Sequence, residues 1–156
     1  MIINLSRKAV SNLLALFSLF LALVYIYGAG LVWGQTLLVE VKGIRTDNGL
    51  VYVTIYDDPK AFETSSTTSY VTYTAKEATG NPVIFTFNRL HGGPFALSIF
   101  HDENSNGIFD LVDQLPREGW GYSNNVGADS YPCFRDASFS MDDEDSNMTI
   151  QMNYAN

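Results

Sequence analysis

From Gln35 onward, apolar and polar residues alternate with a period of two, which is typical of β-strands that bury one face. Asn48-Gly49, between the first two alternating runs, is a strong signal for a hairpin turn. The pattern predicts strands at residues 36–44, 50–58, 70–75, 83–90, 95–101, 134–141 and 147–154, the last two joined across an acidic tip at 142–145. Short strands at this spacing, with no convincing helix among them, predict an all-β, seven-stranded Greek-key β-sandwich over residues 35–156.

A long apolar stretch precedes the strands. Residues 13–33 carry no charge, and Arg7 and Lys8 lie before them. A bilayer is crossed by about 20 apolar residues, and basic residues tend to stay on the cytoplasmic side. We therefore expect one N-terminal hydrophobic helix within residues 1–34. It is either a retained signal-anchor or a signal peptide cleaved after Gly30 or Gly34. Both alternatives place residues 35–156 outside the cytoplasm.

The segment from Asp102 to Asp113 has the spacing of a calcium-binding loop. Oxygen-bearing side chains stand at loop positions 1, 3, 5, 9 and 12, glycine stands at position 6, and the residue at position 7 offers its carbonyl. The predicted Ca²⁺ ligands are Asp102, Asn104, Asn106, the carbonyl of Ile108, Asp110 and Asp113. Aspartate at position 12, where glutamate is usual, predicts coordination that is weaker or closed in a different way. The alternative interpretation is a turn rich in Asp, Asn and Gly that binds no metal.

The residues around this loop indicate a site carried by strands. The stretch that enters it, residues 95–103, alternates like a strand, and Leu115-Pro116 argues against a following helix, so this is not a helix–loop–helix motif. His101 and Asp102 are adjacent in the predicted strand, and neighbouring strand residues point to opposite faces. We therefore do not expect these two side chains to form a catalytic pair.

Further candidates follow the loop. Glu118 could complete the metal shell, and Trp120 and Tyr122 could form a rim for a sugar or a partner. The alternative is a glycine-rich crossing loop whose aromatic residues close one end of the sandwich. Asp136 could pair with a neighbouring arginine or reach the ion, and the sequence does not decide between these roles.

The net charge and the cysteine content limit which partners and which stabilising bonds the protein can have. All 17 acidic residues lie beyond the apolar stretch, together with seven of the nine basic residues. This excess of negative charge disfavours nucleic acids and anionic lipids as partners. Cys133 is the only cysteine, so no intramolecular disulfide can form and the core must supply the stability.

Three stretches resemble the bacterial exported proteins grouped as domain of unknown function 2141: GPFALSIFHDENSNGIFD, PREGWGYSNN and PCFRDASF. The matching positions are His101, Asp102, Asn104, Asn106, Gly107, Asp110, Pro116, Glu118, Gly119, Gly121, Ser123, Pro132, Phe134, Asp136 and Ala137. The resemblance implies an export signal and a small β-sandwich, and it implies no established reaction. Residues 90–100 are also similar to transthyretin-like and carboxypeptidase-regulatory domains, which implies a sandwich of prealbumin or immunoglobulin type.

No nucleophile elbow, zinc signature or phosphate loop occurs in the chain. We therefore expect a non-catalytic, calcium-stabilised binding module on the periplasmic side of a bacterial membrane, with a protein partner. One alternative is an accessory subunit that covers the outer face of an integral membrane complex. A less favoured alternative is a calcium-assisted hydrolase that uses Glu118 and Asp110 as paired carboxylates.

Overall fold

The computed structural model describes Ser18 and residues 35–66, 70–141 and 144–155. The hydrophobic helix expected within residues 1–34 therefore lies outside the described part of the chain. Within the described residues, none of the helices has the length and apolar character that a membrane crossing requires. The structure is mostly β, with 50% strand and 11% helix. The predominance of β-structure expected from the two-residue period is confirmed.

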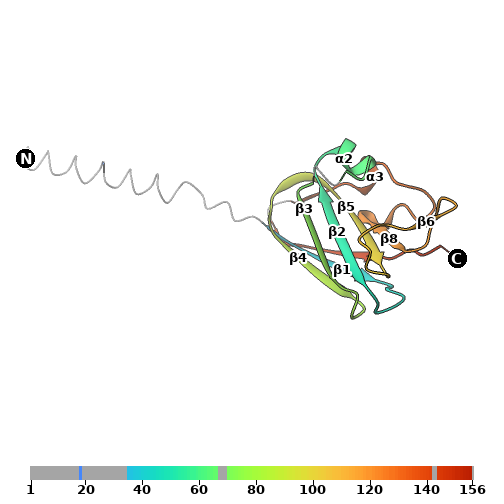
Figure 1. The fold of residues 1–156 in the computed structure, drawn as a ribbon. Helices are drawn as coiled ribbons and strands as arrows, with labels where there is room; N and C mark the ends of the chain where they lie inside the picture. Colours follow the sequence, from blue (N-terminus) through green and yellow to red (C-terminus); the bar gives the residue numbers. More distant parts are fainter. Residues whose placement is uncertain (1–17, 19–34, 67–69, 142–143, 156) are drawn as a thin grey trace, which may run out of the picture. The chain divides into compact units, whose positions relative to one another are not determined.

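Two larger sheets form the body of the domain (Figure 1). The three-stranded sheet has the order β10-β1-β4 and consists of β1 (Gln35–Lys42), β4 (Val83–Leu90) and β10 (Ser146–Gln151). The five-stranded sheet has the order β3-β2-β5-β8, with β9 also pairing with β5. Its members are β2 (Leu50–Tyr56), β3 (Thr72–Glu77), β5 (Gly92–Asp102), β8 (Gly119–Tyr122) and β9 (Phe139–Met141). A small hairpin joins β6 (Leu111–Val112) to β7 (Leu115–Pro116).

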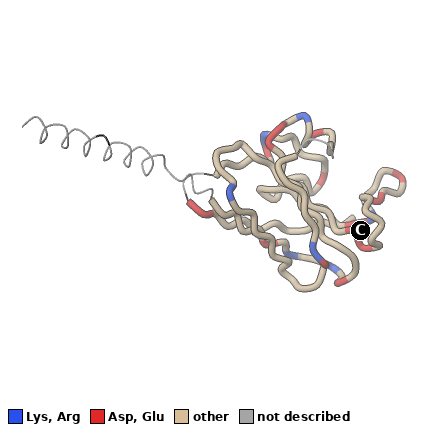
Figure 2. The backbone as a smooth tube through the Cα atoms, turned by 60° about the vertical axis from the view of Figure 1, so that its left-hand side comes forward, with Lys and Arg blue, Asp and Glu red and all other residues tan. Residues whose placement is uncertain are grey.

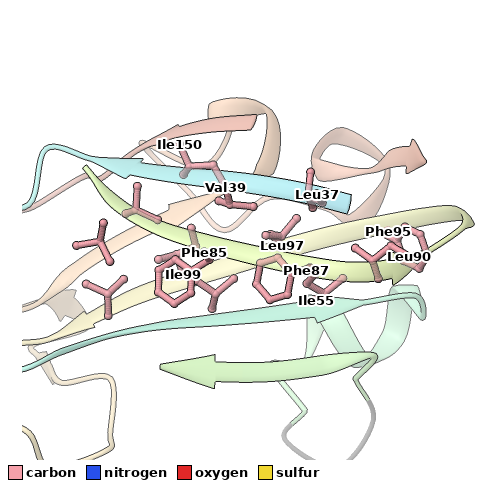
Figure 3. Packing of buried hydrophobic residues seen from close by; sticks show 14 of the residues in the cluster. Leu37, Val39, Ile55, Phe85, Phe87, Leu90, Phe95, Leu97, Ile99 and Ile150 are labelled. Atoms are coloured by element: carbon pink, nitrogen blue, oxygen red, sulfur yellow. The ribbon is translucent and has the colours of Figure 1, made fainter. Parts of the chain in front are cut away.

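The main hydrophobic core is built from the inward-facing residues of both sheets (Figure 3). On β1, Val39 and Val41 are fully buried while Glu40 between them is only half-buried, as the two-residue period requires. Val53 and Ile55 contribute from β2, and Phe85 from β4. The apolar positions that alternate in the sequence are therefore the positions whose side chains form the core.

The first and last strands of the domain are neighbours. β1 pairs with β10 in parallel over six positions, from Leu37 opposite Ser146 to Lys42 opposite Gln151. On its other side β1 pairs with β4 in antiparallel orientation. The two ends of the described domain are thus held together by one continuous ladder.

Three short helical segments accompany the sheets: α2 (Pro59–Glu63), the 3₁₀ turn η1 (Ser123–Asn125) and α3 (Phe134–Ala137). Asp58 caps α2 by accepting from the Ala61 amide at 2.6 Å, and Pro59 occupies the first turn. Phe62 of α2 is fully buried in a second cluster. Its ring lies 5.7–5.9 Å from four other aromatic rings, those of Tyr56, Tyr122, Tyr131 and Phe134.

Four sequence expectations need correction. Asn48-Gly49 does not form a hairpin turn, because β1 and β2 lie in different sheets and do not pair with each other. The strand expected at 134–141 is the helix α3 followed by the short strand β9, because Phe134 and Ala137 turn one helical face into the second cluster. The final two strands do not form a hairpin, since β9 pairs with β5 and β10 pairs with β1, in different sheets. The expected crossing loop at 119–122 is the strand β8, which pairs with β5.

Candidate metal-binding loop

The candidate loop begins where β5 ends, at Asp102, and leads directly into β6 at Leu111. As expected, a strand enters it, and a hairpin rather than a helix follows it. Acidic residues along the chain lie mainly in such connections, while the strands carry few charges (Figure 2). The loop therefore occupies one end of the sheets, where side chains are not committed to the core.

Asp102 anchors the loop from a fully buried position. Its Oδ1 accepts from the Asn106 amide at 3.0 Å, and its Oδ2 accepts from the Gly107 amide at 2.8 Å. Gly107 has φ +74°, the left-handed conformation that glycine adopts without strain. One carboxylate thus fixes the tight turn at the middle of the loop.

Asn104, Asn106 and Asp110 face one another across the loop. Both asparagine side-chain amides donate to Oδ2 of Asp110, at 2.6 Å from Asn104 and 3.0 Å from Asn106. The side-chain oxygen of Asn106 accepts from the Ile108 amide at 2.7 Å. The structure therefore brings these three predicted ligands into direct contact, with Asp102 bound to the same turn.

Asp113 lies apart from this group. It forms, with Gln114, the two-residue turn between β6 and β7, and both residues have positive φ, at 52° and 66°. Two positive φ values are typical of a type I′ hairpin. Asp113 is exposed, and no hydrogen bond joins it to the other predicted ligands. Within the described part of the chain, no three His, Cys, Asp or Glu side chains gather as a metal-binding group.

Glu118 is buried, with 3% of its surface exposed, and it joins the two ends of the loop. Its Oε1 accepts from the Glu103 amide and its Oε2 from the Asp110 amide, each at 3.0 Å. Burial raises the pKa of the Glu118 carboxyl, the two backbone hydrogen bonds oppose this, and the charges of Asp102 and Asp110 add to it. Glu118 therefore closes the loop through the backbone.

Arg45 ties the loop to the rest of the domain. Its Nη2 lies 2.7 Å from a carboxylate oxygen of Glu103 and donates to the carbonyl oxygen of Arg117 at 2.8 Å. The guanidinium also lies over the ring of Tyr154, at 4.4 Å from its centroid. The side chain of Glu103, just after Asp102, and the backbone just before Glu118 are thus held by one side chain from another connection.

His101 points away from Asp102, into the core side of the sheet, and is fully buried. Its two ring nitrogens contact the Tyr154 hydroxyl at 2.9 Å and the Asn48 carbonyl at 2.8 Å. Asp102 faces the loop through its own hydrogen bonds. The two residues do not converge, as the strand geometry predicts, and both ring nitrogens of His101 already have structural partners.

The remaining candidates are separate from the loop. Trp120 is partly buried and donates from its indole to the Gly127 carbonyl at 2.9 Å. Tyr122 is buried in the second cluster. Asp136 pairs with Arg135 at 3.1 Å, one of the arginines considered from the sequence. Both aromatic side chains thus pack in or against the second cluster.

Gly49, part of the Asn-Gly pair between β1 and β2, lies against the first residue of the loop. Gly49 has φ +76°, and a Cβ atom added there would lie 1.8 Å from the carbonyl oxygen of Asp102. Gly49 therefore lets the connection between β1 and β2 approach the backbone of Asp102 closely. No local pattern in the sequence shows that the neighbour of Gly49 is Asp102.

The hairpin that follows the loop displays large aliphatic side chains to solvent. The exposed fractions are 62% for Ile108, 56% for Leu111, 43% for Val112 and 61% for Leu115. Val112 and Leu115 lie opposite one another in the hairpin, so their side chains project from the same face of it. The hairpin is held at its base by the Arg117 amide, which donates to the Asp110 carbonyl at 2.9 Å.

Comparison with known proteins gives one match. The model of a family described as "Uncharacterized protein conserved in bacteria (DUF2141)" matches residues 39–151, from within β1 to the end of β10. No curated protein and no solved structure matches the chain. The matched range contains the whole loop and Glu118.

Proposed function

Since the chain belongs to the DUF2141 family of proteins conserved in bacteria, we propose that it is a non-catalytic interaction module stabilised by calcium. The main support for this proposal is that the loop and the hairpin after it are joined by hydrogen bonds at Asp110. The buried carboxylates of Asp102 and Glu118 fix the base of an element that displays aliphatic side chains to solvent. A Greek-key sandwich of prealbumin or immunoglobulin type is the fold we propose for the two facing sheets.

The chemistry of the loop fits a hard cation. Its side chains offer carboxylate and amide oxygens, the ligands that Ca²⁺ prefers, from Asp102, Asn104, Asn106 and Asp110, with the Ile108 carbonyl as a further donor. The charges of Asp102 and Asp110 both raise the pKa of Glu118, and no basic side chain of the described residues pairs with any of these three carboxylates. A bound cation would relieve that repulsion. We leave Asp113 out of the proposed ligand set because it forms the hairpin turn.

Calcium binding is tested by thermal unfolding of residues 35–156 in excess Ca²⁺ and in chelator. At a Ca²⁺ concentration about 100 times the Kd, binding adds about 2.7 kcal/mol, which corresponds to a rise in Tm of roughly 10 °C. Asp110→Ala should remove most of this calcium-dependent rise. The matched variant Asp129→Ala, at an exposed aspartate outside the loop, should keep it. Equal calcium-dependent shifts in both variants would exclude the loop as the binding site.

The partner surface is tested on the hairpin itself. Leu111→Ser with Leu115→Ser should leave the free energy of unfolding within about 0.5 kcal/mol of wild type, because both side chains are more than half exposed. The same pair should abolish co-purification of a stoichiometric protein partner with the full-length chain. Retention of that partner by the stable double variant would place its contact elsewhere.

We propose a periplasmic location, with residues 13–33 as a retained membrane anchor. The resemblance to exported proteins and the uncharged run after Arg7 and Lys8 support this location. An anchored chain would also suit the second candidate, an accessory subunit covering the outer face of an integral membrane complex. A mature N-terminus near Gln35, measured by intact mass, would exclude the anchor and leave a secreted module.

The hydrolase alternative has less support. Both carboxylate oxygens of Glu118 accept from backbone amides, so neither is available to a substrate without opening the loop. Asp110 is likewise engaged by two asparagine amides. The positions that could have formed a catalytic carboxylate pair instead have structural partners.

A further inference from the structure

Among the residues that the structure describes, one side of the domain presents two sheet edges with no further strand paired to them. β3 ends the five-stranded sheet and β4 ends the three-stranded sheet. The two edges lie side by side, because the Lys76 ammonium on β3 donates to the Ile84 carbonyl on β4 (Figure 1). Large apolar side chains are exposed along this side: Tyr70 at 43%, Val71 at 40%, Tyr73 at 46% and Ile84 at 42%. Open edges with exposed apolar residues are templates for pairing with a further strand.

The backbone of β3 determines which residues such a strand would meet. The Ala78 amide donates to the Gly49 carbonyl at 3.1 Å, which marks this as a hydrogen-bonded pair of the β2–β3 ladder. Hydrogen-bonded pairs alternate along an antiparallel ladder, so every second residue of β3 turns its N–H and C=O toward the open edge. These outward-facing residues are Tyr73, Ala75 and Glu77, whose side chains are also exposed.

We propose that a second copy of this chain pairs with β3 in antiparallel orientation across a two-fold axis at Ala75. In this register Ala75 lies opposite Ala75 of the second copy, and Tyr73 lies opposite Glu77 of the second copy. All three residues with outward-facing N–H and C=O groups are therefore paired, which no other two-fold register achieves. The register at Ala75 sets no like charges opposite one another, and it places the smallest of the three side chains on the axis. The tyrosine hydroxyl and the glutamate carboxylate opposite it form a donor and acceptor pair.

The neighbouring β4 edge adds to the contact. A two-fold axis that joins the β3 edges brings the adjacent β4 edges toward each other on the same side. An edge contact of this kind is small compared with that of an obligate dimer, so the association depends on protein concentration. Each chain carries a formal charge of −8, so added salt should strengthen the association by screening the repulsion.

The register is tested by oxidative cross-linking of the full-length chain in a Cys133→Ser background. Hydrogen-bonded antiparallel partners have Cα atoms about 5.5 Å apart, which suits a disulfide. Ala75→Cys should therefore give a covalent homodimer in high yield under a mild oxidant. The matched variant Glu77→Cys should give little, because its two copies are separated by four strand positions, roughly 14 Å at about 3.4 Å per residue. Equal yields from both variants, or cross-linking of position 75 to a different protein, would overturn the proposal.

A second measurement is independent of cysteine chemistry. Sedimentation equilibrium of the full-length chain should show a reversible monomer–dimer equilibrium that Ala75→Pro abolishes. The Ala75 amide points out of the edge, so proline there removes a hydrogen bond of the dimer and none of the β2–β3 ladder. The variant should keep the circular dichroism spectrum of wild type. A monomer throughout the accessible concentration range for wild type would also overturn the proposal.

Discussion

Glu118→Ala is expected to lower the free energy of unfolding of residues 35–156 by about 4 kcal/mol. A hydrogen bond to a charged group contributes about 1.5–3 kcal/mol, and Glu118 accepts two, from the amides of Glu103 and Asp110. The side chain is almost completely buried, so solvent cannot readily replace it as the acceptor. Alanine would leave both amides without their partner and free the two ends of the loop from each other. Urea unfolding followed by circular dichroism measures the loss.

Two variants distinguish this role from a general effect of removing a carboxylate. Glu118→Gln keeps one acceptor oxygen, so it should lose about half as much stability as alanine. Glu144→Ala, at an exposed glutamate outside the loop, should change stability by less than about 0.5 kcal/mol. A loss at Glu118 no larger than that at Glu144 would contradict the role of Glu118 in closing the loop.

Gly49→Ala is expected to destabilise the same domain by about 3 kcal/mol or more. Two costs add. An alanine in the left-handed region costs about 1–2 kcal/mol, and Gly49 has φ +76°. The new methyl group would also lie 1.8 Å from the Asp102 carbonyl oxygen, so one of the two backbones must move. Because Asp102 begins the loop, this movement should also weaken calcium binding, measured by titration of the folded variant.

Gly92 supplies a matched control for the steric part of this prediction. It has φ +74°, nearly the same as Gly49, but an added Cβ would meet no atom within 4 Å. Gly92→Ala should therefore show only the conformational cost, about 1–2 kcal/mol. Equal losses at the two glycines would mean that the close approach beneath the loop contributes nothing to stability.

The strands that alternate clearly were predicted close to their observed bounds because burial on one face is a local property of the sequence. β4, predicted and found at residues 83–90, is the plainest case. β8 was not predicted because its inward-facing positions, Gly119 and Gly121, have no apolar side chains, so the sequence shows no alternation there. A side chain at Gly119 would collide with Tyr154, and one at Gly121 would press against Ile150. Both neighbours are distant in sequence, so the need for glycine is not visible locally.

The two short helices α2 and α3 were not predicted from the sequence for a similar reason. In α3, Phe134 and Ala137 are three residues apart, a spacing too short to establish a helical period, and the cluster that buries them comes from other parts of the chain. The start of α2 had a readable signal, Asp58 followed by Pro59, which is typical of a helix N-terminus. Five residues are too few for a periodic pattern to support that signal.

The candidate site also contains features that the local sequence predicts and features that depend on distant parts of the chain. The contacts of Asp102, Asn104, Asn106 and Asp110 arise within nine residues, so the spacing of the motif predicted their convergence. The closure of the loop by Glu118 depends on β8, which was not recognised as a strand. Asp113 satisfied the spacing of the motif, yet the hairpin of β6 and β7 takes it to a turn instead.

The parallel pairing of β1 with β10 determines how the domain would respond to mechanical tension. β1 is the first strand of the domain and β10 the last, and in a parallel pair their outward-leading ends lie at opposite ends of the ladder. A force pulling the two chain ends apart would therefore act along the strands and load the whole six-position ladder in shear. An antiparallel arrangement of the same strands would open one hydrogen bond at a time. A domain tethered at its N-terminus and gripped near its C-terminus would resist extension through this single pair of strands.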